Sequence, residues 1–92
     1  MLKTLEDLIA TIRQRKSSSD ESSYTAKLLK DKSLSVEKVK EEIGELIEAV
    51  ENNSNKIHEA ADVLYHLLVY LEANKIKIED VMQELKRRKK FE

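Results

Sequence analysis

The chain has no proline and only one glycine, Gly44, among its 92 residues. Sheets with many short strands rely on these two residues at their turns, so a turn-rich β architecture is disfavoured. The chain is instead dominated by Leu, Glu, Lys and Ala, which favour helices. Its length supports one domain with a thin core. We therefore predict a single all-α domain over residues 1–92, a helical bundle of four main helices.

The charges of the chain nearly balance, with a formal net charge of -1 at pH 7. Such a chain has no overall field to attract nucleic acid or a membrane surface, so neither partner is expected. The absence of cysteine suits a reducing compartment. The N-terminus lacks a secretory signal, and no apolar run has membrane-spanning length. We expect a soluble, cytoplasmic protein.

Apolar residues recur at helical spacing in four stretches, over residues 2–15, 35–51, 56–73 and 78–90. Ser35 is the expected N-cap of the second stretch, and the polar break at 52–55 ends it. The polar segment 17–23 is either a flexible linker or a loop that orders around a ligand. The sequence S-S-Y-T-A-K-L-L at 22–29 predicts a short capped helix. Its hydroxyl-rich start and Lys27 also suit an anion.

Two groups of carboxylates stand out, at E-E-x-x-E (Glu41, Glu42, Glu45) and at E-x-x-D (Glu59, Asp62). Carboxylates three residues apart share a helix face and can hold one hard cation from adjacent turns. Two such pairs on neighbouring helices predict a magnesium site. The alternative for the first group is a solvated charged face, which is the usual role of a charge run.

The stretch 56–73 argues against that alternative. It is apolar nearly all round, which predicts burial nearly all round. Yet Glu59, Asp62 and His66 share the face opposite its main apolar seam. Buried carboxylates without partners are costly and repel one another, so lysines, arginines or a cation must meet them.

The short break at 52–55 predicts that the helices on either side run antiparallel. If residues equally far from the turn lie side by side in this hairpin, Glu45 lies beside Asp62 and Glu48 beside Glu59. Glu42 then lies about two turns further from the turn than Glu59. Glu42 reaches the other acids only if the helices cross or slide. If the acidic faces of the two helices are turned toward each other, their apolar seams must face outward. A second subunit would cover these seams, so we predict a homodimer.

Other polar residues carry less specific signals. His66 is expected to bond a neighbour inside the helical core, and Tyr65 and Tyr70 are expected to be core residues with bonded hydroxyls. No His or Cys spacing supports zinc, and there is no Gly-rich phosphate loop. The basic run at 86–90 complements the dipole of its helix, and its contact with a substrate stays open.

Three stretches of the sequence resemble one enzyme family: S-S-Y-T-A-K-L-L at 22–29, K-V-K-E-E-I-G-E at 38–45 and E-A-A-D-V-L-Y-H-L-L-V at 59–69. Together they resemble the phosphoribosyl-ATP pyrophosphohydrolases of histidine biosynthesis, members of the all-α MazG-like superfamily. The resemblance covers nearly the whole chain. It implies Mg²⁺ ligands at Glu42, Glu45, Glu59 and Asp62, with Glu41 as a further acid, and so favours Glu42 over Glu48.

The activity that the resemblance implies is hydrolysis of 1-(5-phosphoribosyl)-ATP to 1-(5-phosphoribosyl)-AMP and diphosphate. Glu41 or Glu45 would assist as a base. The residues expected to meet the nucleotide substrate or its phosphates are Arg15, Ser23, Tyr24, Thr25, Lys27 and Lys38. Two alternatives remain, a housecleaning (d)NTP pyrophosphohydrolase and a non-enzymatic helical dimerisation module. Association with a phosphoribosyl-AMP cyclohydrolase stays open.

Overall fold

The computed structural model describes residues 2–17 and 22–88, and every regular element in these ranges is a helix. The helices are α1 (Lys3–Lys16), α2 (Tyr24–Lys30), α3 (Lys32–Asn52), α4 (Lys56–Ala73) and α5 (Ile78–Arg87). The all-α prediction is confirmed. Most of the predicted linker, residues 18–21, and the last part of the basic run, Lys89 and Lys90, lie outside the described residues.

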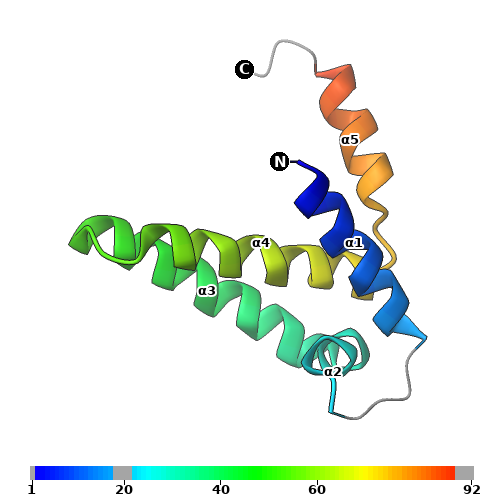
Figure 1. Cartoon of the computed structure of the whole chain (residues 1–92), viewed down its shortest axis with the longest axis horizontal. Helices are drawn as coiled ribbons and strands as arrows, with labels where there is room; N and C mark the ends of the chain where they lie inside the picture. The colour runs from blue at the N-terminus through cyan, green and yellow to red at the C-terminus, as the bar shows by residue number, and fades with distance from the viewer. Residues whose placement is uncertain (1, 18–21, 89–92) are drawn as a thin grey trace.

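Helices α3 and α4 form the predicted antiparallel hairpin, which is the longest feature of the molecule (Figure 1). The turn contains Asn53 and Asn55 with φ angles of 51° and 49°. Asparagine adopts this left-handed conformation more readily than most residues, which explains why the predicted polar break ends one helix and begins the next. The amide of Ser54 donates to the carbonyl of Ala49 at 2.9 Å and closes the end of α3.

Helices α1, α2 and α5 all gather at the other end of the hairpin (Figure 1). The core lies there, where Ile12 of α1 and Leu28 of α2 pack with Leu68 and Val69 of α4. Within one chain the arrangement is thus a hairpin with three helices at one end. The predicted bundle of four main helices is not confirmed within a single chain. No helix within the described ranges is long and apolar enough to cross a membrane.

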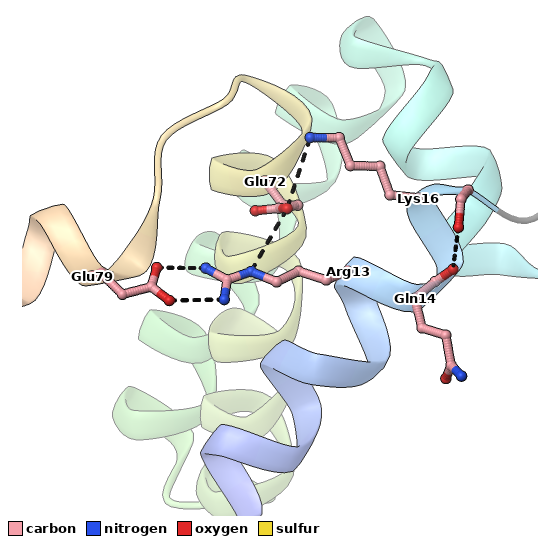
Figure 2. A network of polar contacts seen from close by, with 6 residues as sticks. Arg13, Gln14, Lys16, Glu72 and Glu79 are labelled. Atoms are coloured by element: carbon pink, nitrogen blue, oxygen red, sulfur yellow. Dashed lines mark hydrogen bonds and ion pairs between the residues drawn. The ribbon is translucent and has the colours of Figure 1, made fainter.

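A network of exposed charges also joins the helices at this end (Figure 2). The Arg13 guanidinium of α1 donates two hydrogen bonds to the Glu79 carboxylate of α5, at 2.8 and 2.6 Å. Arg13 and Lys16 each lie 3.8 Å from Oε1 of Glu72 on α4. We call these four residues the surface network. Its opposite charges pair, and the bonds from Arg13 lower the pKa of Glu79 to about 2.

The start of α3 differs from the prediction. Asp31, not Ser35, is the N-cap, and its carboxylate accepts a hydrogen bond from the Leu34 amide at 3.0 Å. Asp caps a helix about as well as Ser, so α3 begins four residues, just over one turn, earlier than expected. Ser35 is therefore buried inside the helix. The short capped helix predicted at 22–29 is confirmed as α2, where the Ser23 hydroxyl accepts from the Ala26 amide.

The burial of α4 also differs from the prediction. The face that carries His66, Val69 and Ala73 is buried, whereas Ile57 is 87% exposed and Leu64 is 53% exposed. The predicted all-round burial is therefore wrong for one chain. The reason is that the other helices cover only the end of the hairpin remote from the turn (Figure 1).

Candidate active site

The acids of the two predicted motifs lie together between α3 and α4. Glu42, Glu45 and Glu59 each offer a carboxylate oxygen, and these atoms all lie within 4.8 Å of one another. Glu59 and Asp62 form a second such group with His58, whose Nε2 lies 3.3 Å from Oδ2 of Asp62. We call Glu42, Glu45, Glu59 and Asp62 the acidic cluster. The structure thus places the four residues of the predicted magnesium site in two groups that share Glu59.

Two oxygens of the acidic cluster are buried without a hydrogen-bond donor among the described residues, Oε2 of Glu42 and Oε2 of Glu59. A buried carboxylate oxygen without a donor is destabilising, so the arrangement needs a positive partner. The donor set consists mainly of carboxylate oxygens, which are the ligands that Mg²⁺ prefers. A hard divalent cation therefore fits the residues present.

Burial and repulsion inside the acidic cluster raise the pKa of Glu42 to about 7. Burial is the largest cause, followed by the hydrogen bond with Glu45 and by the charges of Glu45, Asp62 and Glu59. Burial also raises the pKa of Glu59, together with the charges of Glu45 and Asp62, while His58 opposes this shift. Groups whose charged forms disfavour one another in this way are typical of functional sites.

Glu42 lies nearer to the other acids than equal distances from the turn predicted. Glu42 is only 8% exposed and lies in the acidic cluster. Glu48 is exposed, and it lines an open hollow near the turn together with Glu45 and Glu59. The prediction compared only positions along the two helix axes and ignored how each helix is rotated about its own axis. The buried positions of α3 are Ser35, Glu42 and Ala49, which are seven residues apart and so share one face. Glu48 lies off that face.

Some residues predicted to meet the substrate border the acidic cluster. The Lys38 ammonium lies 3.3 Å from Oε2 of Glu41, and this bond raises the pKa of Lys38. Burial raises the pKa of the Tyr24 hydroxyl, an effect that the nearby charge of Lys38 opposes and that of Glu42 reinforces. Tyr24, Lys38 and Glu41 thus lie at one edge of the acidic cluster.

The remaining predicted substrate residues are placed differently. The Ser23 hydroxyl serves as the cap of α2, and the Thr25 hydroxyl bonds the Tyr65 hydroxyl of α4. Both groups therefore already have structural partners. Arg15 and Lys27 are exposed, and within the described ranges neither side chain forms a hydrogen bond or ion pair with the acidic cluster. Their contact with substrate stays a prediction.

Sequence reasoning missed the partner of His66. This side chain is 7% exposed, and its Nε2 lies 3.0 Å from the Tyr24 hydroxyl of α2. Its Nδ1 lies 2.9 Å from the carbonyl oxygen of Asp62, one turn earlier in α4. The prediction of a core histidine bonded to a neighbour is confirmed, as is the bonded hydroxyl of Tyr65. Periodicity could not identify Tyr24, because 42 residues separate it from His66.

Comparison with known proteins gives a consistent result. Residues 5–89 match the family model described as phosphoribosyl-ATP pyrophosphohydrolase. The phosphoribosyl-ATP pyrophosphatase of Cereibacter sphaeroides is 45% identical over 93 residues, covering 95% of this chain and 87% of the relative. That of Haloarcula marismortui is 39% identical over 90 residues, 92% of each chain. The histidine biosynthesis bifunctional protein HisIE of Pyrococcus furiosus is 44% identical over 92 residues, covering 97% of this chain and 43% of that protein.

Proposed function

Because this chain belongs to the phosphoribosyl-ATP pyrophosphohydrolase family, we propose that it hydrolyses 1-(5-phosphoribosyl)-ATP to 1-(5-phosphoribosyl)-AMP and diphosphate. The observation that carries the proposal in the molecule itself is the acidic cluster. Four carboxylates converge from two helices, and two of their buried oxygens have no donor among the described residues. A purely structural helical module has no need of such an arrangement. We also propose that the enzyme is cytoplasmic, as its sequence suggests.

We propose that Glu42, Glu45, Glu59 and Asp62 hold Mg²⁺. The orphaned oxygens of Glu42 and Glu59 support this assignment, as does the proximity of all four acids. Magnesium supplies charge neutralisation at phosphate oxygens when it is bound at such a site. Part of the work of the protein is to keep four like charges together in advance, so that the ligands need little rearrangement.

Glu41 is the best-placed base outside the acidic cluster. Its side chain is exposed, and one carboxylate oxygen is bonded to Lys38, so the other oxygen can accept a proton from a water molecule at the edge of the cluster. Glu45, which is exposed and belongs to the cluster, is the second candidate. Lys38 would contact phosphate oxygens by charge-assisted hydrogen bonds. Ser23, Tyr24, Thr25, Lys27 and Arg15 complete the proposed substrate contacts.

We propose that the chain forms a homodimer in which two hairpins make one four-helix core. The hairpin half near the turn has no cover from α1, α2 or α5 (Figure 1). Its exposed large apolar side chains are Ile43, Ile47 and Val50 of α3 with Ile57 and Leu64 of α4. Exposed large apolar side chains in such number on one hairpin favour association. Sedimentation equilibrium tests this proposal: Leu64→Lys should give monomers, whereas Lys3→Glu should not.

Product analysis tests the proposed activity. Purified protein would be incubated with 1-(5-phosphoribosyl)-ATP and, separately, with ATP and the four dNTPs, each with and without magnesium. We expect magnesium-dependent diphosphate from 1-(5-phosphoribosyl)-ATP alone. Diphosphate from the dNTPs would indicate that the acidic cluster serves a housecleaning (d)NTP pyrophosphohydrolase instead. No diphosphate from any substrate would overturn the enzymatic proposal and favour the dimerisation module.

A further inference from the structure

A clamp of four side chains joins the start of α2 to the middle of α4. Two successive residues of α2, Tyr24 and Thr25, bond two successive residues of α4, His66 and Tyr65. The rings also pack: Tyr24 stacks on Tyr65 with centroids 6.4 Å apart, and Tyr65 meets His66 edge-on at 4.9 Å. We call these four residues the α2–α4 clamp. The clamp fixes α2 in both position and rotation relative to α4.

The backbone decides which nitrogen of His66 carries the proton. The carbonyl oxygen of Asp62 can only accept a hydrogen bond, so Nδ1 of the neutral ring must be the donor at 2.9 Å. Nε2 is then an acceptor, and the Tyr24 hydroxyl must donate to it at 3.0 Å. The direction of the whole chain of bonds is therefore set by the helix backbone at Asp62. His66 orients Tyr24, and the backbone carbonyl of Asp62, a residue of the acidic cluster, in turn orients His66.

Tyr24 is the part of the clamp that a ligand can reach. It is 44% exposed, whereas His66 is buried. The same tyrosine lies close enough to Lys38, Glu41 and Glu42 for their charges to act on its hydroxyl. A ring held at this position borders both the acidic cluster and the lysine proposed to meet phosphate. Any substrate bound there would contact the Tyr24 side chain, whose rotamer is held by the hydrogen bond to the buried His66.

We propose that His66 is a positioning residue for the substrate, acting through the hydrogen bond that it accepts from Tyr24. The inference rests on the proposed function, because the ligand is the nucleotide substrate of that site. His66 does not touch the substrate or take part in the proton transfer. Its effect is to hold Tyr24, and with it the first turn of α2, beside the acidic cluster before the substrate arrives.

Tyr24→Phe is the main test, since it removes the hydroxyl and keeps the ring. Loss of one hydrogen bond that orders the binding surface should raise KM for 1-(5-phosphoribosyl)-ATP about tenfold. The kcat and the magnesium concentration for half-maximal activity should stay the same, because the acidic cluster is untouched. Tyr70→Phe is the matched control, as the Tyr70 hydroxyl makes no hydrogen bond with residues 2–17 or 22–88. It should leave KM unchanged.

A double-variant cycle and a spectroscopic measurement separate positioning from simple packing. His66→Leu should raise KM by a similar factor, and adding Tyr24→Phe to it should raise KM no further, because both changes break the bond between Tyr24 and His66. Long-range ¹H–¹⁵N correlation spectra should show the Nδ1–H tautomer of neutral His66 in the wild type, with a shifted Nε2 resonance in Tyr24→Phe. If His66→Leu does not fold, Tyr24→Phe and the spectra still decide.

The outcomes are distinct. A wild-type enzyme that turns over 1-(5-phosphoribosyl)-ATP, with unchanged KM in Tyr24→Phe, overturns the positioning role and leaves the proposed function intact. An Nε2–H tautomer, or additive effects in the double variant, also overturns it. A wild type that releases no diphosphate from this substrate overturns the proposed function, and the positioning role falls with it.

Discussion

The acidic cluster and the surface network use the same kinds of residue in opposite ways. In the surface network, Arg13 lies between two carboxylates, those of Glu72 and Glu79, and the charges pair at the protein surface (Figure 2). In the acidic cluster, four carboxylates lie in two groups that share Glu59, and two of their oxygens are buried without a donor among the described residues. The opposite charges of the surface network neutralise one another and link the helices, so they need no further partner. The proposed Mg²⁺ would neutralise the like charges that the acidic cluster holds together.

The pKa values of the two regions show the same contrast. The bonds from Arg13 lower the pKa of Glu79, so its contribution to stability is present above pH 4.5 and is lost as the pH falls through about 2. Burial raises the pKa of Glu42, so the folded protein without metal loses stability as the pH rises from 4.5 to about 7. The surface network stabilises the fold near neutral pH, whereas the acidic cluster destabilises it there.

The largest expected effect is on activity. Glu45→Gln removes a proposed ligand and should lower kcat/KM about 1000-fold or more, since metal sites supply several kcal/mol of transition-state stabilisation. The fold should persist, as judged by circular dichroism, because this side chain is exposed. Glu48→Gln is the matched control three residues away and should retain activity within about twofold. Equal losses in both variants would contradict the assignment of the cluster.

Magnesium should stabilise the protein through the acidic cluster and not through the surface network. At a concentration about 100 times its Kd, magnesium should stabilise the wild type by about 2.7 kcal/mol and raise Tm by about 10 °C or more. Glu42→Gln should lose most of this gain, while Arg13→Gln should keep it. Thermal unfolding with and without magnesium checks both. A gain of equal size in Glu42→Gln would show that the ion binds elsewhere.

The pH dependence of the metal-free protein sharpens the contrast further. Tm measured in the presence of a chelator should fall as the pH rises from about 5 to about 7, because Glu42 must lose its proton among other carboxylates. Glu42→Gln has no such proton to lose, so it should show a flatter profile and a higher Tm at neutral pH. The same slope in both proteins would place the titrating group outside Glu42.

The smallest effect is expected in the surface network. Arg13→Gln should lower Tm by about 2 °C, and less in high salt, because exposed ion pairs are weak and screened. The kcat/KM should change by less than about twofold, since the network lies away from the acidic cluster. A large loss of activity with normal Tm would mean that Arg13 contributes to the site, and the contrast between the two regions would fail.

The sequence by itself determined the helices and the identity of the acids. The bounds of α4 and the turn at 52–55 follow from a period of 3.6 residues and from four turn-forming residues, both of which are local properties. The spacing of E-E-x-x-E and E-x-x-D likewise places each pair of carboxylates on one helix face. These features depend only on neighbours along the chain.

Only the tertiary structure decided how those helices meet. The burial of Glu42 in the hairpin, the pairing of Tyr24 with His66 and the bond between the Thr25 and Tyr65 hydroxyls all depend on rotation and docking of separate helices. Periodicity fixes which residues share a face but not which face turns toward which neighbour. Packing of the core at one end of the hairpin fixes those angles, through contacts between residues far apart in the chain.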